Sequence, residues 1–387
     1  MPGIDEQVRT TVVGVSEPLL GVPIGELGLV QGVAVDGSTA VIAVAEPLPD
    51  RGHWADLEAA VREAALGVDG IERVDVDVRL MEDDELPAVA RVLKGEPPPN
   101  PLAVVDVAVA GAGAQQEPHH RVNPFTSSRT RILAIASGKG GVGKSSVTTN
   151  LAIALAQRGR RVAVVDADVW GFSLPRMLGV DHPPDLIDDV LVPPEVHGVR
   201  AISMGFFTRE DEAIVWRGPM LHKALEQFLT DVHWADPDYL VIDLPPGTGD
   251  VSLSIAQFLP RAEIVIVTTP QLAAQKVAQR AGAMAEKVHL DVAGVIENMS
   301  WFTGDDGKRY ELFGAGGGEQ LSQRLGVPLL GQIPLVPALR EGGDQGAPII
   351  VAAPDDEASV IFSAIAERLD TELAPTRISH PELRVQT

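Results

Sequence analysis

The sequence predicts an α/β fold in which a doubly wound, mostly parallel sheet domain follows a small α+β domain. Apolar runs alternate with helix-period segments from residue 131 onward, and a glycine-rich segment joins the first such strand to the first such helix. Residues 96–130 are rich in Pro, Gly, Ala, Gln and Ser. We therefore expect domains at residues 1–95 and 131–375, a flexible linker at 96–130 and a tail at 376–387.

The small domain is predicted from apolar periodicity and one turn signal. Asp36-Gly37 is a dipeptide typical of hairpins. The expected elements are a helix near 6–13, strands around 30–35 and 40–45, a helix at 54–66 and a strand at 73–80.

The larger domain is predicted from short β-branched runs separated by helical segments. Strands are expected at 132–136, 161–165, 239–242, 263–268 and 293–297, and helices at 146–157, 220–231, 271–289 and near 357–373. This alternation indicates a mostly parallel sheet covered by helices.

The segment Gly138 to Ser145 is typical of a loop that binds phosphate. Its glycines let backbone N–H groups surround an anion, and the next helix presents its positive end to that anion. Lys144 is expected to reach the β- and γ-phosphates of a nucleoside triphosphate, and the Ser145 hydroxyl to bind Mg²⁺. The expected nucleotide-binding residues here are Gly138, Lys139, Gly140, Gly141, Val142, Gly143, Lys144, Ser145 and Ser146.

Aspartates stand where two predicted strands end, which is where ligands bind in open α/β sheets. Asp243 is expected to hold Mg²⁺, with Asp166 supporting the metal site. Asp168 is expected to orient or deprotonate the attacking water. The Gly- and Pro-rich run after Asp243, residues 244–250, is typical of a switch loop that senses the γ-phosphate.

Base recognition is inferred from an absent acid. In GTPases the strand that leads to the base pocket ends in Asn-Lys-x-Asp, whereas this chain has Asn298-Met299-Ser300-Trp301. Asn298 is expected to hydrogen-bond an adenine edge, so ATP is favoured over GTP.

Lys139 adds a second lysine to the loop. Gly-Lys-Gly-Gly-Val-Gly-Lys-Ser resembles the deviant Walker A sequence of the MinD, ParA and ArsA group of dimerising ATPases. The resemblance implies a P-loop NTPase in which Lys139 acts on a nucleotide in a second copy of the chain, as an arginine finger does. Lys139, Lys144 and Asp168 are therefore the expected catalytic residues.

Further motifs resemble the Mrp/ApbC branch of that group over residues 128–370. They are found at 171–179, 204–206, 216–219 and 297–300. The resemblance implies a homodimeric, Mg²⁺-dependent ATPase that carries iron-sulfur clusters to apo-proteins. Residues 16–19 and 24–30 resemble the small iron-sulfur-assembly domain often fused before such ATPases.

The chain departs from this pattern because it contains no cysteine. Members of the branch usually carry Cys-x-x-Cys after the Asn-Met-Ser run, whereas residues 304–307 here read Gly-Asp-Asp-Gly. Thiolates are the normal ligands of such clusters. The partner is then an iron-sulfur apo-protein or a cysteine-bearing assembly protein. Two alternatives stay open: a nucleotide-switched adaptor without a cluster, and a ParA-like positioning ATPase.

Charge and composition restrict the partners further. The net charge is −23, from 54 acidic and 31 basic residues, which disfavours nucleic acid and anionic membranes. The chain shows neither an export signal nor an apolar run long enough to span a membrane. We therefore expect a cytoplasmic protein.

Overall fold

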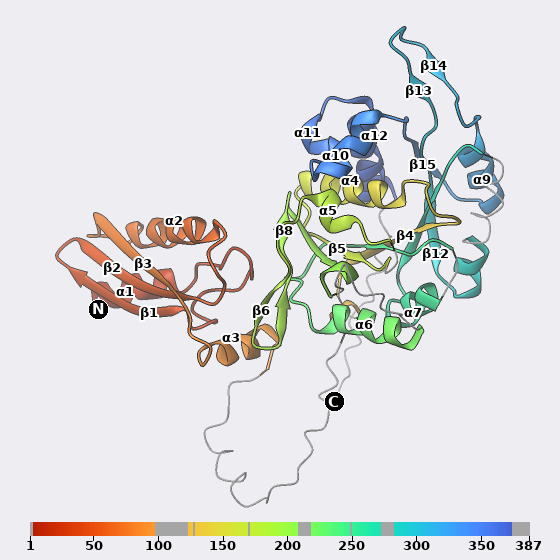
Figure 1. Cartoon of the computed structure of the whole chain (residues 1–387). Helices are drawn as coiled ribbons and strands as arrows, with labels where there is room; N and C mark the ends of the chain where they lie inside the picture. The colour runs from red at the N-terminus through yellow and green to blue at the C-terminus, as the bar shows by residue number, and fades with distance from the viewer. Residues whose placement is uncertain are drawn as a thin grey trace, which may run out of the picture. The chain divides into compact units, whose positions relative to one another are not determined.

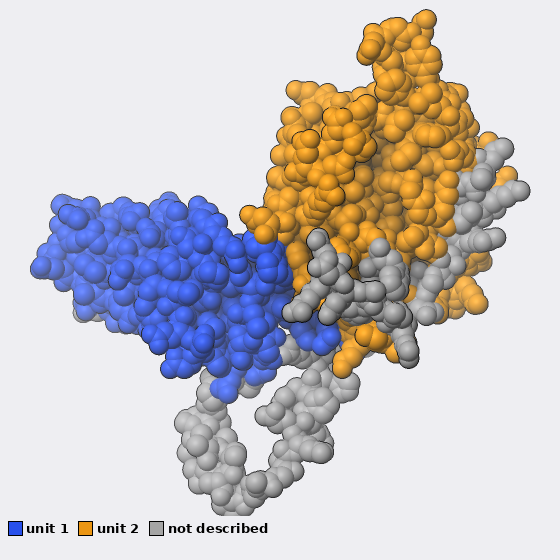
Figure 2. Space-filling view, in the orientation of Figure 1, with its two compact units in different colours: residues 1–124, 182–195, 226–236 blue, residues 125–181, 196–225, 237–387 orange. Residues whose placement is uncertain are grey.

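The computed structural model describes residues 3–96, 123–126, 128–168, 171–207, 218–247, 250–271 and 282–373. The chain forms two compact units, coloured separately in Figure 2. The smaller unit contains residues 1–124, 182–195 and 226–236, and the larger contains 125–181, 196–225 and 237–387. Two segments from beyond the predicted linker thus group with the N-terminal residues. Most of that linker and the predicted tail lie outside the described residues.

The smaller unit is built on a three-stranded sheet in the order β1-β2-β3. β1 (Val30–Asp36) pairs antiparallel with β2 (Thr39–Glu46), which pairs parallel with β3 (Arg73–Leu80). Gly37 lies in the turn with φ of 61°, so the hairpin predicted from Asp36-Gly37 is confirmed. The helices are α1 (Ile4–Val12), α2 (His53–Leu66) and α3 (Leu86–Leu93), the last of which was not predicted.

A short hairpin from later in the chain completes the core of this unit. It consists of β6 (Asp185–Ile187) and β7 (Val190–Val192), which pair antiparallel. Ile187 and Val192 belong to the same buried cluster as Leu57 and Val61 of α2.

The larger unit contains an eight-stranded sheet in the order β15-β12-β11-β4-β10-β5-β9-β8 (Figure 1). Its central strands are parallel and buried along their whole length, as expected for a sheet covered on both faces. The predicted doubly wound fold is therefore confirmed. The strands are β4 (Arg131–Ser137), β5 (Val162–Asp166), β8 (Glu195–Val196), β9 (Val199–Ser203), β10 (Tyr239–Asp243), β11 (Glu263–Thr268), β12 (Asp291–Glu297) and β15 (Leu329–Gln332).

Helices cover both faces of this sheet. In Figure 1, α4 (Lys144–Gln157) and α5 (Leu174–Leu178) lie with α10 (Pro337–Gln345), α11 (Ile349–Ala352) and α12 (Glu357–Glu367) on one face. The remaining elements are α6 (Gly218–Thr230), α7 (Asp250–Phe258), α9 (Gly317–Leu325), the strand pair β13 (Phe302–Thr303) and β14 (Arg309–Tyr310), and three short helical turns at Pro124–Thr126, Met204–Phe207 and Arg368–Glu372. None of the helices in the described ranges has both the length and the apolar character that crossing a membrane requires.

The register of the central strands positions the site. β10 pairs with β5 so that Asp243 stands opposite Asp166, and with β4 so that Asp243 stands opposite Ile135. Because parallel strands end at the same edge, both aspartates lie beside the loop that follows β4.

Candidate functional site

A cavity of about 500 Å³ opens at the carboxyl edge of the sheet, beside the loop between β4 and α4. Loop, strand-end and helix residues all contribute to it. Its lining comprises Ser137, Lys139, Gly140, Gly141, Val142, Gly143, Lys144, Ser145, Ser146, Asp168, Gly171, Ser173, Met177, Pro245 and Pro246. The sequence predicted eight members of the loop and Asp168 as site residues, and the structure brings them together. Gly138 lies between two of the lining residues.

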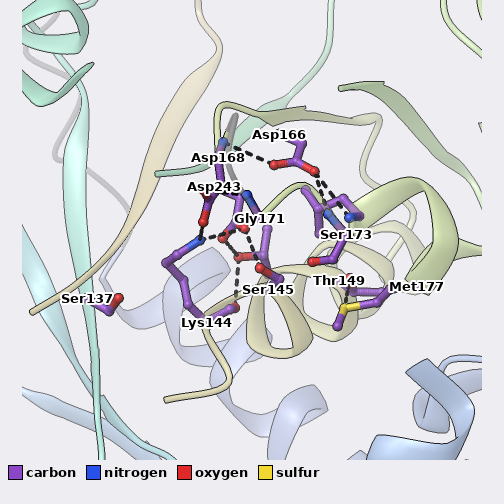
Figure 3. A network of polar contacts seen from close by, with 12 residues as sticks. Ser137, Lys144, Ser145, Thr149, Asp166, Asp168, Gly171, Ser173, Met177 and Asp243 are labelled. Carbon is purple, nitrogen blue, oxygen red and sulfur yellow. Dashed lines mark hydrogen bonds and ion pairs between the residues drawn. The ribbon is translucent and has the colours of Figure 1, made fainter. Parts of the chain in front are cut away.

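The centre of the site is the carboxylate of Asp243, which is fully buried. Ser145 Oγ donates to its Oδ2 at 2.6 Å, and Thr148 Oγ1 donates to its Oδ1 at 2.7 Å. Lys144 Nζ lies 2.6 Å from Oδ2 and forms an ion pair with it, without the alignment of a directed hydrogen bond. Figure 3 shows Lys144 and Ser145 of α4 converging on Asp243 at the end of β10.

Asp166 occupies the end of β5 and is also fully buried. Its Oδ1 accepts from the Asp168 N–H at 3.2 Å, and its Oδ2 accepts from Ser173 N–H, Leu174 N–H and Ser203 Oγ at 3.1 to 3.2 Å. Burial and the nearby charge of Asp243 raise its pKa to about 7. Asp166 thus holds the segment after β5 in place, and its expected support of a metal stays a prediction.

Asp168 faces the same cavity from the segment after β5. Its Oδ2 lies 3.8 Å from Lys144 Nζ, and its Oδ1 accepts from the Gly171 N–H at 3.2 Å. The residue is 8% exposed. Its position on the cavity wall suits a group that orients water, a role that stays a prediction.

Lys139 lines the same cavity as Lys144 and has a different partner within the chain. Its Nζ donates to Gln271 Oε1 at 3.1 Å, within the same chain. The ammonium is partly exposed rather than buried. The two lysines of the loop therefore have different partners, Gln271 for Lys139 and Asp243 for Lys144, and action of Lys139 on a second copy stays a prediction.

Asn298 follows β12 and forms a hydrogen bond with the loop between β4 and α4. Its Nδ2 donates to the Val142 carbonyl at 2.9 Å, and its Oδ1 accepts from the Met299 N–H at 3.0 Å. The residue is 2% exposed. Both ends of the amide are used within the chain, so the expected contact with an adenine edge stays a prediction that needs one of these bonds to change.

Sequence reasoning missed three side chains that hold the predicted ones. Thr148 fixes Asp243, Ser203 fixes Asp166 and Gln271 fixes Lys139. Thr148 follows Lys144 by four residues, so helix periodicity alone places both on one face of α4. Ser203 and Gln271 carry no local signal because strand pairing brings them to the site.

The oxygen donors of this site suit Mg²⁺. Ser145 and Asp243 offer a hydroxyl and a carboxylate whose oxygens already converge within 2.6 Å. The buried Asp243 is balanced here by the Lys144 ammonium, a cation in contact with the same oxygen.

The donors after Asn298 do not suit an iron-sulfur cluster. The turn between β13 and β14 offers carboxylates only, and Asp306 already accepts from the Lys308 N–H at 3.0 Å and the Tyr310 hydroxyl at 2.9 Å. The whole chain has no thiol. The cluster predicted from the family resemblance therefore has no ligand set in this chain.

Trp216 and Arg217 of the family resemblance, and Thr248 and Gly249 of the predicted switch loop, lie outside the described residues. Pro246 and Gly247 of the predicted switch loop are described, and the Gly247 N–H donates to the Ser137 carbonyl at 2.9 Å.

Comparisons with known proteins agree with this geometry. The family described as NUBPL iron-transfer P-loop NTPase matches residues 128–370, and the family described as iron-sulfur cluster assembly protein matches residues 5–78. The iron-sulfur cluster carrier protein of Mycobacterium leprae is 42% identical over 373 residues, which are 94% of this chain and 92% of the relative. That of Bacillus subtilis is 38% identical over 96% of this chain and 98% of its own.

Two solved structures resemble the larger unit. A nucleotide-binding protein of Archaeoglobus fulgidus in complex with ADP aligns with a TM-score of 0.52 and 33% identity, covering 60% of this chain and 91% of that one. The cell division ATPase MinD of Pyrococcus furiosus aligns with a TM-score of 0.50 and 27% identity, covering 63% and 99%. The chain therefore belongs to the NUBPL iron-transfer P-loop NTPase family, which includes the iron-sulfur cluster carrier proteins, and it bears the small iron-sulfur assembly domain at its N-terminus.

Proposed function

We propose that the chain is a Mg²⁺-dependent ATPase that works as a homodimer in the maturation of iron-sulfur proteins. The observation that carries the proposal is that Lys144 and Ser145, which line the cavity, both contact the buried carboxylate of Asp243. The Archaeoglobus relative with bound ADP and the Pyrococcus relative named as an ATPase support a nucleotide as the ligand.

Each residue has a separate task in this proposal. The loop N–H groups and Lys144 bind the phosphates, and Lys144 leaves Asp243 to do so. Ser145 and Asp243 hold Mg²⁺, which when bound neutralises charge on the β- and γ-phosphate oxygens. Asp168 orients the attacking water, and Asp166 keeps the Asp168 backbone in position through its hydrogen bond to that N–H.

Dimer formation and base choice follow from two further residues. Lys139 supplies positive charge to the nucleotide of the partner copy once its bond to Gln271 is exchanged for a phosphate. Asn298 favours adenine, so the substrate is ATP.

The cluster, in this proposal, is the cargo of a partner and not a group held by this chain. A specific observation favours a second function, a nucleotide-switched adaptor: no cysteine is available to ligate iron. In both functions ATP changes the affinity for a cysteine-bearing partner, and they differ in whether a cluster passes through the complex.

Steady-state hydrolysis by the purified full chain tests the proposal. Wild type should release phosphate from ATP only with Mg²⁺, and Lys144→Ala should lower the rate about 10²–10³-fold because a charge aimed at the transferred phosphoryl group is lost. Lys308→Ala is the matched control, since Lys308 is exposed and pairs only with Asp306, at 3.5 Å, among the described contacts. Equal rates for wild type and Lys144→Ala would remove the ATPase proposal.

A further inference from the structure

Three ionisable side chains meet inside the smaller unit, well away in sequence from the phosphate-binding loop. Glu17 lies in the segment between α1 and β1, Glu46 ends β2 and His53 begins α2. One oxygen or nitrogen from each lies within 4.8 Å of the others. Glu17 and Glu46 are fully buried, and His53 is 8% exposed.

Most of their polar atoms have no hydrogen-bond partner in the part of the chain that the structure describes. The Leu20 N–H donates to Glu17 Oε2. Glu17 Oε1, both oxygens of Glu46 and both ring nitrogens of His53 find no partner in hydrogen-bond geometry among the described residues. His53 Nε2 lies 3.8 Å from Glu46 Oε1, too far for a hydrogen bond. Buried polar atoms are rarely left in this way, because each has lost its hydrogen bonds to water without gaining a replacement.

The local charge balance is also unfavourable. Two carboxylates share a buried site, and taking each charge out of water costs several kcal/mol unless a cation compensates for it. Burial and the neighbouring Glu46 raise the pKa of Glu17 to about 7. Burial lowers the pKa of His53, but Glu46, Glu17 and Asp50 outweigh this effect and raise it, so a protonated His53 balances at most one of the two carboxylates.

We propose that Glu17, Glu46 and His53 bind one divalent transition-metal ion, for which Zn²⁺ is the probe. Imidazole and carboxylate together suit zinc or ferrous iron, whereas Mg²⁺ prefers oxygen donors alone. Two ligand atoms of a tetrahedral zinc stand about 3.4 Å apart, close to the 3.8 Å between His53 Nε2 and Glu46 Oε1. A dication balances two carboxylates and a neutral imidazole, so the buried site becomes neutral.

The ion joins three segments of a small domain. It connects the segment after α1, the end of the central strand β2 and the start of α2, and it leaves a coordination position for water or an outside donor. Residues 49–52, which lie between Glu46 and His53 in the sequence, are exposed. The donor set contains no thiolate, so this is a mononuclear site and not a place for an iron-sulfur cluster.

Metal retention by the full chain tests the inference. The protein is stripped with a chelator, its phosphate-binding loop is saturated with ADP and excess Mg²⁺, and Zn²⁺ is added before desalting. Wild type should retain about one zinc per chain and melt several degrees higher. Glu46→Gln and His53→Gln should each weaken Zn²⁺ binding at least tenfold.

The controls separate this site from adventitious binding. Glu26→Gln and His197→Gln change exposed residues of the same types and should retain zinc as wild type does. Co²⁺ in place of Zn²⁺ should give visible absorption bands that His53→Gln alters, which reports the imidazole ligand directly. Retention that is equal in all four variants, displacement of Zn²⁺ by Mg²⁺, or no retention by wild type would each overturn the inference, the last showing that protons alone balance the carboxylates.

Discussion

Lys144 Nζ lies 2.6 Å from Oδ2 of Asp243, so the cation expected to bind phosphate and the carboxylate expected to bind Mg²⁺ pair with each other. Lys144 is 7% exposed and Asp243 is fully buried. Breaking a buried pair by removing one partner is strongly destabilising. A nucleotide that arrives with Mg²⁺ supplies a new partner to both residues at once, whereas free nucleotide or free Mg²⁺ supplies only one. We therefore expect the two ligands to bind cooperatively.

Thr148 should control the affinity for Mg²⁺. Its hydroxyl donates to Asp243 Oδ1 at 2.7 Å and so fixes the carboxylate that is expected to hold the ion. Thr148→Val should raise the Mg²⁺ concentration for half-maximal hydrolysis about tenfold, as for other groups that orient a metal ligand, with a smaller effect at saturating Mg²⁺. A Mg²⁺ titration of the hydrolysis rate measures this.

The neighbouring threonine provides the control. Thr149 Oγ1 faces the Met177 sulfur at 4.0 Å and does not contact Asp243 in the described contacts. Thr149→Val should therefore leave the Mg²⁺ titration unchanged. If both variants shift it equally, the effect comes from packing of α4 and not from Asp243.

Lys139 should act across the dimer. Lys139→Ala should bind ATP with affinity near that of wild type, because Lys144 and the loop N–H groups remain, but it should lose hydrolysis. Asp168→Ala should also be inactive. In a mixed dimer, one site has Asp168 from one chain and Lys139 from the other, so mixing the two inactive variants should restore activity.

Heterodimer formation must be verified in the same samples, for example with two affinity tags. Gln271→Ala is a useful companion, because it removes the partner that Lys139 has within its own chain and should leave hydrolysis intact or faster. Heterodimers that form without regaining activity would argue that Lys139 acts within its own chain.

The purified chain should not retain a [4Fe-4S] cluster. Anaerobic reconstitution followed by desalting should leave neither stoichiometric iron and sulfide nor a cluster absorption band, because no thiolate is present. Thr303→Cys with Asp306→Cys places Cys-x-x-Cys on the hairpin and should gain cluster retention. Iron and sulfide retained by the cysteine-free chain would show that carboxylate or imidazole ligands suffice.

Tyr239 should ionise late. Its hydroxyl donates to Asp370 Oδ1 at 2.9 Å, and burial together with that carboxylate raises its pKa to about 12. An ordinary tyrosine has a pKa of 10.0, the value expected in the unfolded chain, so the raised pKa stabilises the folded state fully below pH 10 and this contribution is lost as the pH rises from 10 to about 12. When the folded protein is titrated with base, its tyrosinate absorption should therefore show a step near pH 12.

The chain has two tyrosines, which makes this titration simple to assign. The hydrogen bond to Asp306 also raises the pKa of Tyr310 on the exposed hairpin, so the two variants are compared: Tyr239→Phe should remove the step near pH 12, and Tyr310→Phe should keep it. A late step that persists in Tyr239→Phe would mean that the Asp370 bond does not control Tyr239.

The sequence predicts those parts of the site that local patterns encode. Glycine spacing identifies the loop around Lys144, and β-branched runs place Asp166 and Asp243 at strand ends within a residue of their observed positions. What it does not predict depends on pairing between distant segments. The strand order puts Ser203 against Asp166, and the end of β12 brings the Asn298 amide to the Val142 carbonyl.

In the smaller unit, too, local sequence patterns predict some features and miss those that depend on contacts between distant segments. The hairpin and α2 follow from turn chemistry and periodicity, but the meeting of Glu17 with Glu46 and His53 does not, because each residue alone looks like an ordinary surface polar group. The packing of residues 187–192 into this unit is likewise invisible to local patterns.

The contact between Gly143 and Asn298 limits how this chain can diversify. Gly143 has φ of 78°, and a Cβ placed there would lie 2.2 Å from Asn298 Nδ2. Any side chain at position 143 therefore meets two obstacles, and shortening residue 298 removes only the steric one while it frees the Val142 carbonyl. In a library that randomises both positions, functional variants should keep glycine at 143 whatever residue occupies 298. Residue 298 can therefore change while Gly143 is retained, but Gly143 cannot change even after residue 298 has been shortened.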